Sequence, residues 1–361
     1  MNLFERLSAD DYEQVAFNHH KPSGLRSIVA IHSTALGPSL GGTRFYPYAS
    51  EEAALNDVLR LAKGMTYKAA AAGLDLGGGK AVIIGDPARD RTEELIRAHG
   101  RFIDTLGGRY ITAEDVGTNR ADMDLIRRET RWVTGVSPSF GGSDDPSPAT
   151  AYGVLHGLRA MAAELWGSDD LTGRRFAVQG VGKVGISLVG HLVQAGATVV
   201  GADVNPAALA RAVEEFGIET ADVESIHAVE CDVFVPCALG GILNDDTIPQ
   251  LQCAAVGGAA NNQLLAPEHG KLLAEAGILY APDFVINAGG VINVADELDG
   301  YDRERARSRI AGIFGTLRRV FETARSERSA TAEVANRIAE ERIRAVGRLK
   351  LVQTSAPRRL A

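Results

Sequence analysis

The amino-acid sequence predicts an α/β fold with two domains, the second of them built on a doubly wound parallel sheet. A length of 361 residues fits two domains of roughly 150 residues or somewhat more each. Between Arg175 and Tyr280, short apolar runs alternate with amphipathic stretches, a pattern typical of parallel strands connected by helices. A run rich in Ser, Gly, Asp and Pro over residues 137–148 indicates a hinge between the domains.

The first domain extends to about residue 147 and mixes strand and helix patterns. Its predicted elements are strands at 27–32 and 80–84 and helices at 51–64 and 93–106. Ser147 followed by Pro148 predicts the start of a helix that runs to about residue 165. A Ser side chain can cap a free N–H as the N-cap residue, and Pro fits the first helical turn.

The second domain has the alternation expected of a doubly wound sheet. Its predicted strands are 175–179, 198–203, 232–235, 254–257 and 278–280, with helices at 183–195 and 206–216. Two long helical patterns follow, at about 302–326 and 330–349. The tail after Leu351 is predicted to be disordered.

Composition excludes several classes of protein. Hydrophobic residues make up 45% and charged residues 23% of the chain, which is ordinary for a globular protein. The net charge of -8 argues against nucleic acid or an anionic membrane as the main partner. No apolar run is long enough for a membrane span, and the N-terminus has no signal-peptide pattern, so we expect a cytoplasmic protein.

The three cysteines, Cys231, Cys237 and Cys253, predict neither a disulfide framework nor a metal site. Their number is odd, and their spacing does not match a CxxC motif. We expect buried structural thiols and no bound metal.

A glycine motif predicts a dinucleotide site. The segment that contains Gly180, Gly182, Lys183, Val184 and Gly185 reads GxGxxG, follows a predicted strand and opens a predicted helix. Asp203 ends the next strand, 23 residues after Gly180, where a carboxylate accepts hydrogen bonds from the ribose hydroxyls. No arginine follows Asp203 directly, so the motif favours a Rossmann-type domain that binds NAD rather than NADP. The alternative is a glycine turn in an unrelated α/β fold.

Two lysines lie in unusual surroundings. Lys68 is surrounded by small apolar residues, and Lys80 follows three glycines and leads into an apolar strand. A lysine in a low-dielectric site, or near a second cation, has a lowered pKa and can act as a base near neutral pH. The alternative is a pair of solvated surface lysines.

Polar residues also stand where strand patterns end. Asp115 follows such a pattern and is a candidate to exchange protons with a substrate amine, although a lone Asp there is usually a turn former. Asn261 and Asn262 come after another strand and would supply neutral amide donors, although Asn-Asn is also a common turn.

Taken together, these segments resemble the glutamate/leucine/phenylalanine/valine dehydrogenase family, and within it the branched-chain branch of leucine and valine dehydrogenases. The resemblance runs from about residue 24 to about residue 345 and rests on eight motifs in order. These are Leu36–Arg44, Gly64–Lys68, Gly77–Lys80, Thr112–Gly117, Pro146–Thr150, the GxGxxG segment, Gly258–Gln263 and Ala281–Gly290.

The resemblance implies a role for each matching residue. Lys68 would hold the substrate carboxylate, helped by Asn262 and the backbone at Gly41 and Gly42. Lys80 would be the general base that activates water for attack on the imine, and Asp115 would relay protons to and from the amine. Thr150 would contact the nicotinamide carboxamide, and Asn261 and Asn287 would line the cofactor cleft.

The resemblance also implies a substrate. The side-chain pocket would be formed by apolar residues, namely Leu40, Ala113, Val291 and Val294. Relatives that use glutamate place a lysine and a serine there, and a buried carboxylate without such partners is unfavourable. Relatives that use phenylalanine often have glycine at the position of Ala113. We therefore expect overlapping use of valine, leucine and isoleucine, since one methylene is worth only about 1–3 kcal/mol.

The expected reaction is reversible oxidative deamination of these amino acids to 2-oxo acids and ammonia, with NAD as acceptor. The alternatives are a phenylalanine dehydrogenase of the same family and a catalytically silent NAD-binding protein. Residues 1–147 would be the substrate-binding and oligomerisation domain, completed by the C-terminal helix at 330–361, and residues 148–329 the NAD domain. We expect a homo-oligomer, from dimer to octamer.

One position departs from the family pattern. Relatives usually have glycine where this chain has Asp144, within the hinge loop. If that loop needs a positive φ, Asp tolerates it better than most residues but less well than glycine.

Overall fold

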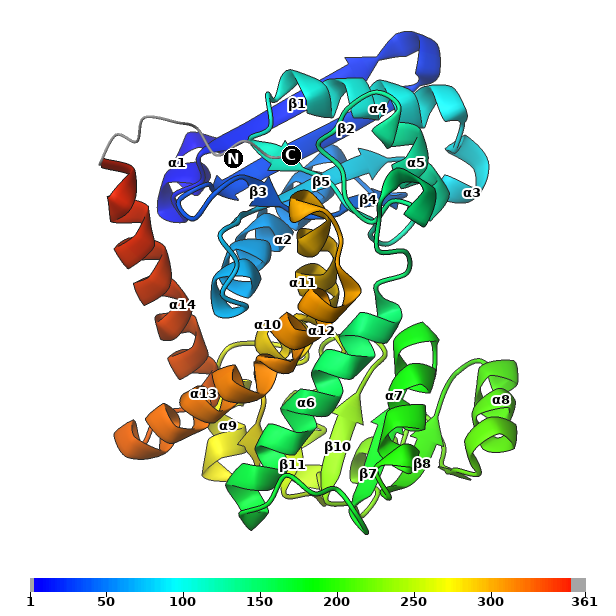
Figure 1. Cartoon of the computed structure of the whole chain (residues 1–361), viewed down its shortest axis with the longest axis vertical. Coiled ribbons are helices and arrows are strands. Elements are labelled where there is room, and N and C mark those ends of the chain that lie inside the picture. The colour runs from blue at the N-terminus through cyan, green and yellow to red at the C-terminus, as the bar shows by residue number, and fades with distance from the viewer. Residues whose placement is uncertain (1–2, 352–361) are drawn as a thin grey trace. The chain divides into compact units, whose positions relative to one another are not determined.

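The computed structural model describes residues 3–351 and contains two compact units (Figure 1). Contacts assign Pro146–Asn293 and Glu304–Ile338 to the second unit. The first unit takes the chain up to Asp145, the short segment Val294–Arg303, and the chain from Ala339 onward. The tail that the sequence predicts to be disordered lies outside the described residues.

The first unit is built on a mixed sheet with the order β1-β2-β5-β3-β6, in which β4 also pairs with β5. β1 and β2 run antiparallel to their neighbours, and the pairings of β3, β4 and β6 are parallel. Its strands are β1 (Gln14–His20), β2 (Leu25–Ser33), β3 (Ser39–Leu40), β4 (Thr43–Tyr46), β5 (Gly77–Ile84) and β6 (Tyr110–Ile111). Its helices up to Asp145 are α1 (Leu3–Ala9), α2 (Glu51–Ala71), α3 (Pro87–Asp90), α4 (Glu93–Thr105) and α5 (Arg120–Arg127).

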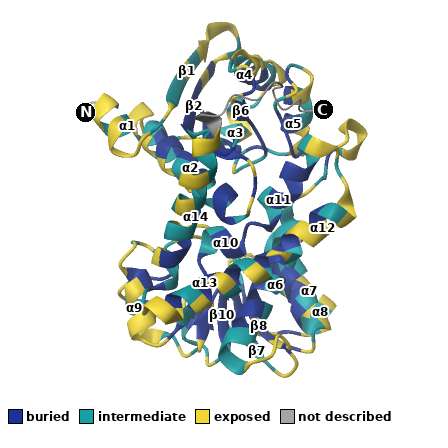
Figure 2. Cartoon of the chain, turned by 60° about the vertical axis from the view of Figure 1, so that its left-hand side comes forward, coloured by how far each residue is buried: buried dark blue, intermediate teal, exposed yellow. Residues whose placement is uncertain are grey.

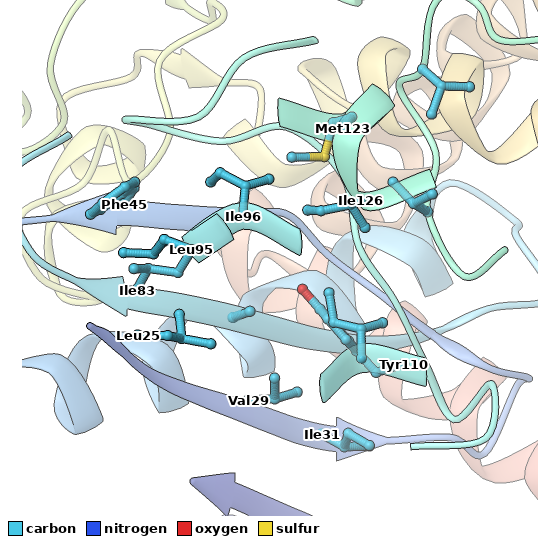
Figure 3. Packing of buried hydrophobic residues seen from close by; sticks show 14 residues of the cluster. Leu25, Val29, Ile31, Phe45, Ile83, Leu95, Ile96, Tyr110, Met123 and Ile126 are labelled. Carbon is cyan, nitrogen blue, oxygen red and sulfur yellow. The ribbon is translucent and has the colours of Figure 1, made fainter. Parts of the chain in front are cut away.

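Both faces of this sheet are covered, because successive side chains of a strand point to opposite faces. On β2, Val29 and Ile31 belong to a buried cluster with α4 and α5, which Figure 3 shows. Ile28 and Ala30 belong to a second cluster with α2. β2 accordingly contains an unbroken apolar run at its centre, residues 28–31, as expected for a strand buried on both sides.

The second unit is a parallel doubly wound sheet with the order β12-β11-β10-β7-β8-β9, which confirms the predicted fold class. Its strands are β7 (Arg175–Gln179), β8 (Thr198–Ala202), β9 (Glu219–Thr220), β10 (Val233–Pro236), β11 (Ala255–Val256) and β12 (Leu279–Tyr280). Its helices before residue 287 are α6 (Ser147–Trp166), α7 (Lys183–Gln194), α8 (Pro206–Phe216), α9 (His269–Glu275) and α10 (Asp283–Ile286).

Helices lie on both sides of this sheet. α6 and α7 pack side by side, with α7 against β7 and β8 (Figure 1). A separate cluster joins Ala177, Phe234 and Leu273, and so brings α9 to the strands. Figure 2 shows β8 and β10 in dark blue among helices whose outer faces are teal and yellow.

The last helices differ from their predicted form in one respect. They are α11 (Gly289–Asp296), α12 (Arg303–Ala311), α13 (Ile313–Glu327) and α14 (Thr331–Gly347). The single helix predicted over 302–326 is wrong, since the chain breaks at Gly312 into α12 and α13. Glycine is a poor helix former, which accounts for the break at this position.

The start of α6 also corrects a prediction. Pro146 is the N-cap residue, Ser147 is the first helical residue, and no side chain caps the helix. Pro146 and Pro148 are both compatible with a helix start, and the sequence pattern placed the N-cap one residue too late. Asp144 has φ +64°, so this loop does need a positive φ at the position where relatives usually have glycine.

Separate segments tie the first unit together. The carboxylate of Glu297 accepts N–H groups from Gly135 at 2.9 Å and Ser143 at 2.8 Å. On α14, Glu340 accepts the Tyr67 hydroxyl at 3.0 Å, and Arg342 donates to Asp75 at 3.0 Å. Both the 294–303 segment and the end of α14 are therefore parts of this unit.

No helix within residues 3–351 is long and apolar enough to cross a membrane. Within the same range, no group of three or more His, Cys, Asp or Glu side chains is placed to hold a metal ion. The three cysteines are free, as expected, but they are intermediate in exposure rather than buried. Cys231 and Cys253 come two residues before β10 and β11, and Cys237 directly follows β10.

Candidate active site

Lys80 is a buried cation within β5. Only 4% of the residue is exposed, which excludes the alternative of a solvated surface lysine. The strand begins at Gly77, earlier than the apolar pattern indicates. A Cβ at Gly78 would lie 2.0 Å from the Thr66 amide nitrogen, so glycine allows α2 to pack directly on β5. The helix that bears Lys68 therefore lies on the strand that bears Lys80.

Asp115 is the ion-pair partner of Lys80. It follows β6 in a tight turn, where its N–H donates to the Thr118 hydroxyl at 2.9 Å. One carboxylate oxygen, Oδ2, pairs with the Lys80 ammonium. The other, Oδ1, accepts from Arg44 Nε at 3.0 Å. The structure thus brings together the two predicted reacting groups and adds a third that the sequence analysis did not assign.

These neighbours determine the charge of Asp115. Burial by itself raises the pKa of this carboxyl, but the charges of Lys80 and Arg44 outweigh it and lower the pKa to about 2. Since this folded-state pKa lies below the ordinary value of 3.8, the pairing stabilises the fold above pH 4 and is lost as the pH falls toward 2. Asp115 is a carboxylate at neutral and alkaline pH.

Further charged and polar contacts extend from Arg44 to Asp57 and Tyr48. Arg44 Nη1 donates to Asp57 on α2 at 2.8 Å, and the Tyr48 hydroxyl donates to the same Asp57 oxygen at 2.6 Å. We call Lys80, Asp115, Arg44 and Asp57 the ion-pair chain. Its side chains are between 5% and 21% exposed, well below typical surface ion pairs. The sequence analysis did not identify Arg44, Asp57 or Tyr48. Of these, only Arg44 could have been found from the sequence, because it is the last residue of the Leu36–Arg44 motif.

The Gly41–Gly42 turn packs against the same groups. A Cβ at Gly41 would lie 1.8 Å from the Gly79 carbonyl oxygen, and one at Gly42 would lie 2.8 Å from the Asp115 Cβ. The Tyr110 hydroxyl donates to the Gly41 carbonyl at 2.5 Å and so links the turn to the core shown in Figure 3. The glycines are required because their neighbours occupy the space of a side chain.

The other substrate-site candidates divide between the units. Leu40, Ala113 and Val294 belong to the first unit and are buried, with 1%, 9% and 6% exposure. Lys68 lies in the last turn of α2, also in the first unit, and is partly buried. Val291 and Asn262 belong to the second unit, where Asn262 has φ +52°. The roles of these residues stay predictions.

The GxGxxG segment forms the expected turn between β7 and α7. Gly180 has φ +93°, and a Cβ at Gly185 would lie 2.0 Å from the Gly180 carbonyl oxygen. Gly182 is the N-cap of α7 and has nothing within 4 Å of its Cβ position. The first N–H groups of a helix have no intrahelical partner and attract anions. The cradle therefore fits the pyrophosphate of a dinucleotide.

Asp203 is held at the end of β8 beside this turn. Its Oδ2 accepts the Val181 N–H at 2.8 Å, and its Oδ1 accepts the Asn205 N–H at 2.8 Å. These bonds fix a carboxylate next to the glycines, as the predicted ribose contact requires. The carboxylate keeps acceptor capacity, since two oxygens offer about four lone-pair sites.

The amides predicted to line the cofactor cleft meet each other. Asn287 Nδ2 donates to Asn261 Oδ1 at 2.9 Å and to the Ala259 carbonyl at 3.1 Å. Among the described residues no donor reaches the buried Asn287 Oδ1. A buried acceptor without a donor is unfavourable, and the carboxamide of a nicotinamide would supply one. Thr150, in the first turn of α6, donates its hydroxyl to the Pro146 carbonyl at 3.0 Å.

Comparisons with known proteins identify the family of the chain. The family profile described as Glu/Leu/Phe/Val dehydrogenase, dimerisation domain, matches residues 12–132. The profile described as Glutamate/Leucine/Phenylalanine/Valine dehydrogenase matches residues 141–210 and 205–346. Together they cover most of the chain and confirm the resemblance that the motifs indicated.

Individual relatives extend over nearly the full length. Leucine dehydrogenase from Geobacillus stearothermophilus is 59% identical over 343 residues, which cover 95% of this chain and 94% of the relative. Valine dehydrogenase from Streptomyces virginiae is 53% identical over 335 residues, or 92% and 94% of the two chains. The crystal structure of L-tryptophan dehydrogenase from Nostoc punctiforme has a TM-score of 0.83 and 44% identity, with 95% and 99% coverage. The chain therefore belongs to the glutamate/leucine/phenylalanine/valine dehydrogenase family and is an amino-acid dehydrogenase.

Proposed function

We propose that the protein catalyses the NAD-dependent, reversible oxidative deamination of branched-chain L-amino acids to 2-oxo acids and ammonia. The observation that carries the chemistry is the buried pair of Lys80 and Asp115, packed against the Gly41–Gly42 turn. The identity of 59% and 53% to a leucine and a valine dehydrogenase supports branched-chain substrates. The silent-protein alternative is disfavoured because both reacting groups are present and in contact.

The candidate substrate-site residues have separate parts in the proposed chemistry. Lys68 holds the substrate carboxylate, with help from Asn262 and the Gly41–Gly42 backbone. Lys80 accepts a proton from water that attacks the imino carbon. Asp115 relays protons to and from the departing amine, and its contact with Lys80 provides the path between the two groups.

Dehydrogenases of this family use a pyridine nucleotide, whose nicotinamide ring accepts the hydride from Cα of the substrate. The finer choice of NAD rests on Asp203. Its carboxylate lies where a 2′-phosphate would be repelled, and no arginine follows it directly. The Gly180–Gly185 turn would hold the pyrophosphate, and Asn287, Asn261 and Thr150 the nicotinamide end.

The pocket residues favour an aliphatic substrate side chain. Leu40, Ala113 and Val294 are buried and apolar. A glutamate side chain placed among them would be an uncompensated buried charge, which costs several kcal/mol. Valine, leucine and isoleucine differ by one methylene or its position, so their rates should overlap.

A substrate panel tests this proposal. NADH absorbance would be followed at alkaline pH with NAD and, separately, L-valine, L-leucine, L-isoleucine, L-phenylalanine, L-tryptophan and L-glutamate. Fastest turnover on the three aliphatic substrates is expected. Fastest turnover on an aromatic substrate, as the tryptophan dehydrogenase relative would suggest, would keep the chemistry and refute the pocket. Binding of NAD without turnover on any substrate would favour the silent-protein alternative.

Ala113→Gly tests the pocket directly. The Ala113 methyl group shortens the proposed pocket, so its removal should shift the ratio of kcat/KM toward phenylalanine by roughly tenfold, the size of a one-methylene effect. The same panel measures the change, with Ala98→Gly on α4 as a control outside the proposed site. An unchanged ranking of substrates would show that Ala113 does not line the pocket.

We further propose a homo-oligomer, supported by the match of residues 12–132 to a domain described as a dimerisation domain. The substrate partner is a small molecule. The cytoplasmic location stays a prediction from the sequence.

A further inference from the structure

Arg44 is a member of the ion-pair chain to which the proposed function gives no role. Its Nε contacts Asp115 at 3.0 Å and its Nη1 contacts Asp57 at 2.8 Å, so one guanidinium bridges two carboxylates. We propose that Arg44 is a positioning residue that holds Asp115 in place for Lys80 and allows the site to release its proton at a lower pH. This inference rests on the proposed function, because it assumes that Lys80 acts as the general base.

The positioning argument follows from geometry. A guanidinium is a planar fork whose donors point in fixed directions. Asp57, on the long helix α2, anchors one side of the fork, and the Tyr48 hydroxyl and Arg60 Nη2 also donate to Asp57, at 2.6 and 2.9 Å. Arg44 therefore fixes Oδ1 of Asp115, which leaves Oδ2 toward Lys80.

The electrostatic argument follows from counting charges. The ion-pair chain holds two cations, Lys80 and Arg44, and two anions, Asp115 and Asp57. When Lys80 loses its proton, Asp115 is still paired with Arg44. Without Arg44 the same step would leave a buried carboxylate with no cation, which is strongly unfavourable.

Other titratable or polar groups around Asp115 do not replace Arg44. Arg60 meets Asp57 from the exposed side of α2. The hydroxyl of Tyr110 donates to the Gly41 carbonyl, and that of Thr118 lies on the Asp115 amide. Glu114, the preceding residue, is acidic and so cannot take the place of a cation. Among the described residues, Arg44 is thus the cation that pairs with Asp115 in addition to Lys80.

Two variants with opposite expected signs test the inference. In Arg44→Gln, loss of a cation should move the acidic limb of the kcat/KM pH profile to higher pH by about one unit, within the range for one nearby charge. In Asp57→Asn, loss of an anion should move the same limb to lower pH. Arg44→Lys keeps the charge but not the fork, so its limb should stay near the wild-type position while kcat falls.

Controls separate this inference from a loss of folding and from the proposed function. Lys63→Gln removes a cation from α2, the helix that carries Asp57. Lys63 pairs with Asp10 at 2.6 Å, away from the ion-pair chain, so this variant should leave the kcat/KM pH profile unchanged. NAD affinity and the thermal transition report whether each variant is folded. If all three site variants lose activity with the limb unmoved, or if the limb moves in the same direction for Arg44→Gln and Asp57→Asn, the inference is wrong. If the wild-type protein deaminates no amino acid, the proposed function itself has failed.

An independent observation concerns Cys231 and Cys253 in the second unit. β10 and β11 pair Val233 with Ala255, and each cysteine stands two residues before its member of that pair. The Cys231 N–H donates to the Gln252 carbonyl at 3.1 Å, which continues the pairing. Neighbouring strands lie about 4.8 Å apart, within the Cα separation that a disulfide accepts.

The two thiols also contact each other. The Cys231 thiol donates a hydrogen bond to Cys253, and this bond lowers the pKa of Cys253. Cys253 is therefore the thiol of the pair that ionises more readily. Burial raises the pKa of Cys237 to about 12, so the third cysteine is a built-in comparison.

We infer that Cys231 and Cys253 are a redox-sensitive pair that closes an intramolecular disulfide with a peroxide oxidant. The Cys253 thiolate attacks one peroxide oxygen and the O–O bond breaks, which gives a sulfenic acid and hydroxide. The hydroxide takes up the proton that the Cys253 thiol had released and leaves as water. The Cys231 sulfur then attacks the Cys253 sulfur, the S–O bond breaks, and the departing hydroxide takes up the Cys231 thiol proton and leaves as a second water. The two electrons lost by the thiols reduce the peroxide.

Thiol counting tests this inference. Folded protein would be treated with hydrogen peroxide, denatured, and its thiols counted, with the intact mass measured in parallel. The expected count falls from three to one with loss of two hydrogens, and a reductant reverses it. Cys231→Ser and Cys253→Ser should each prevent the disulfide, and Cys237→Ser should not. Three remaining thiols in the wild-type protein, or a disulfide that needs Cys237, would overturn it.

Discussion

The candidate substrate site and the candidate cofactor site are built from different kinds of groups. In the first unit the working groups are charged side chains, Lys80, Asp115 and Arg44, which come from three separate strands or turns and are buried against one another. In the second unit the working groups are mostly backbone N–H groups at the Gly180–Gly185 turn, with Asp203 as the nearby charge. One site depends on contacts between distant segments and the other on a local turn.

This difference determines how each site should respond to substitution. A charge within the ion-pair chain has partners that become uncompensated when it is removed, and a buried unpaired charge is costly. A glycine in the turn has no partner to lose, and its replacement acts through the volume of one added methyl group. The first site should therefore fail through electrostatics and the second through sterics.

The largest effect is expected for Lys80→Ala. Loss of the proposed base should lower kcat at least about a hundredfold, the usual contribution of general acid–base catalysis. NAD affinity should remain, since the Gly180–Gly185 turn belongs to the other unit. Stopped assays of NADH formation and fluorescence titration with NAD measure the two quantities. Retained turnover would remove Lys80 from its proposed role.

The glycine turn offers a matched pair of substitutions. A Cβ at Gly185 would lie 2.0 Å from the Gly180 carbonyl oxygen, so Gly185→Ala should destabilise the fold by about 1–3 kcal/mol, as overpacking does, and weaken NAD binding. A Cβ at Gly182 meets nothing within 4 Å, so Gly182→Ala should keep the thermal transition and still weaken NAD binding. If Gly182→Ala bound NAD normally, the pyrophosphate would not lie over this residue.

The same contrast explains what the sequence could and could not predict. The strand, glycine turn, helix and following acid of the proposed cofactor site are contiguous, so the sequence of residues 175–203 was enough to predict this local structure. The bond from Arg44 to Asp115 joins residues 71 positions apart, and no periodicity encodes it. Helix breaks also depend on context, since Gly312 interrupts a pattern that reads as one helix.

Asp203→Ser tests cofactor choice, with a smaller expected effect. The carboxylate accepts the Val181 and Asn205 N–H groups, and Ser can still accept one of them. Loss of the charge removes repulsion toward a 2′-phosphate and a charge-assisted bond to the ribose, together worth roughly ten- to a hundredfold. The ratio of kcat/KM for NAD over NADP should fall by that factor. An unchanged ratio would mean that other residues select the cofactor.

The smallest effect is expected at Asp144, which compares backbone strain with an ion pair. With φ +64° this residue is in the left-handed region, and its side chain pairs with Arg120. Asp144→Ala should destabilise the first unit by about 1 kcal/mol, because alanine adopts this region poorly. Asp144→Gly loses the same ion pair but relieves the strain, and an exposed pair is worth at most about 1 kcal/mol.

Arg120→Gln separates the two contributions at Asp144, since it removes the pair and keeps the dihedral angle. The expected order of unfolding midpoints is alanine lowest, with glycine and Arg120→Gln both close to the wild-type value. If alanine and glycine were equally stable, the left-handed conformation would not be a source of strain. If Arg120→Gln matched alanine, the ion pair rather than the backbone would be what this hinge loop depends on.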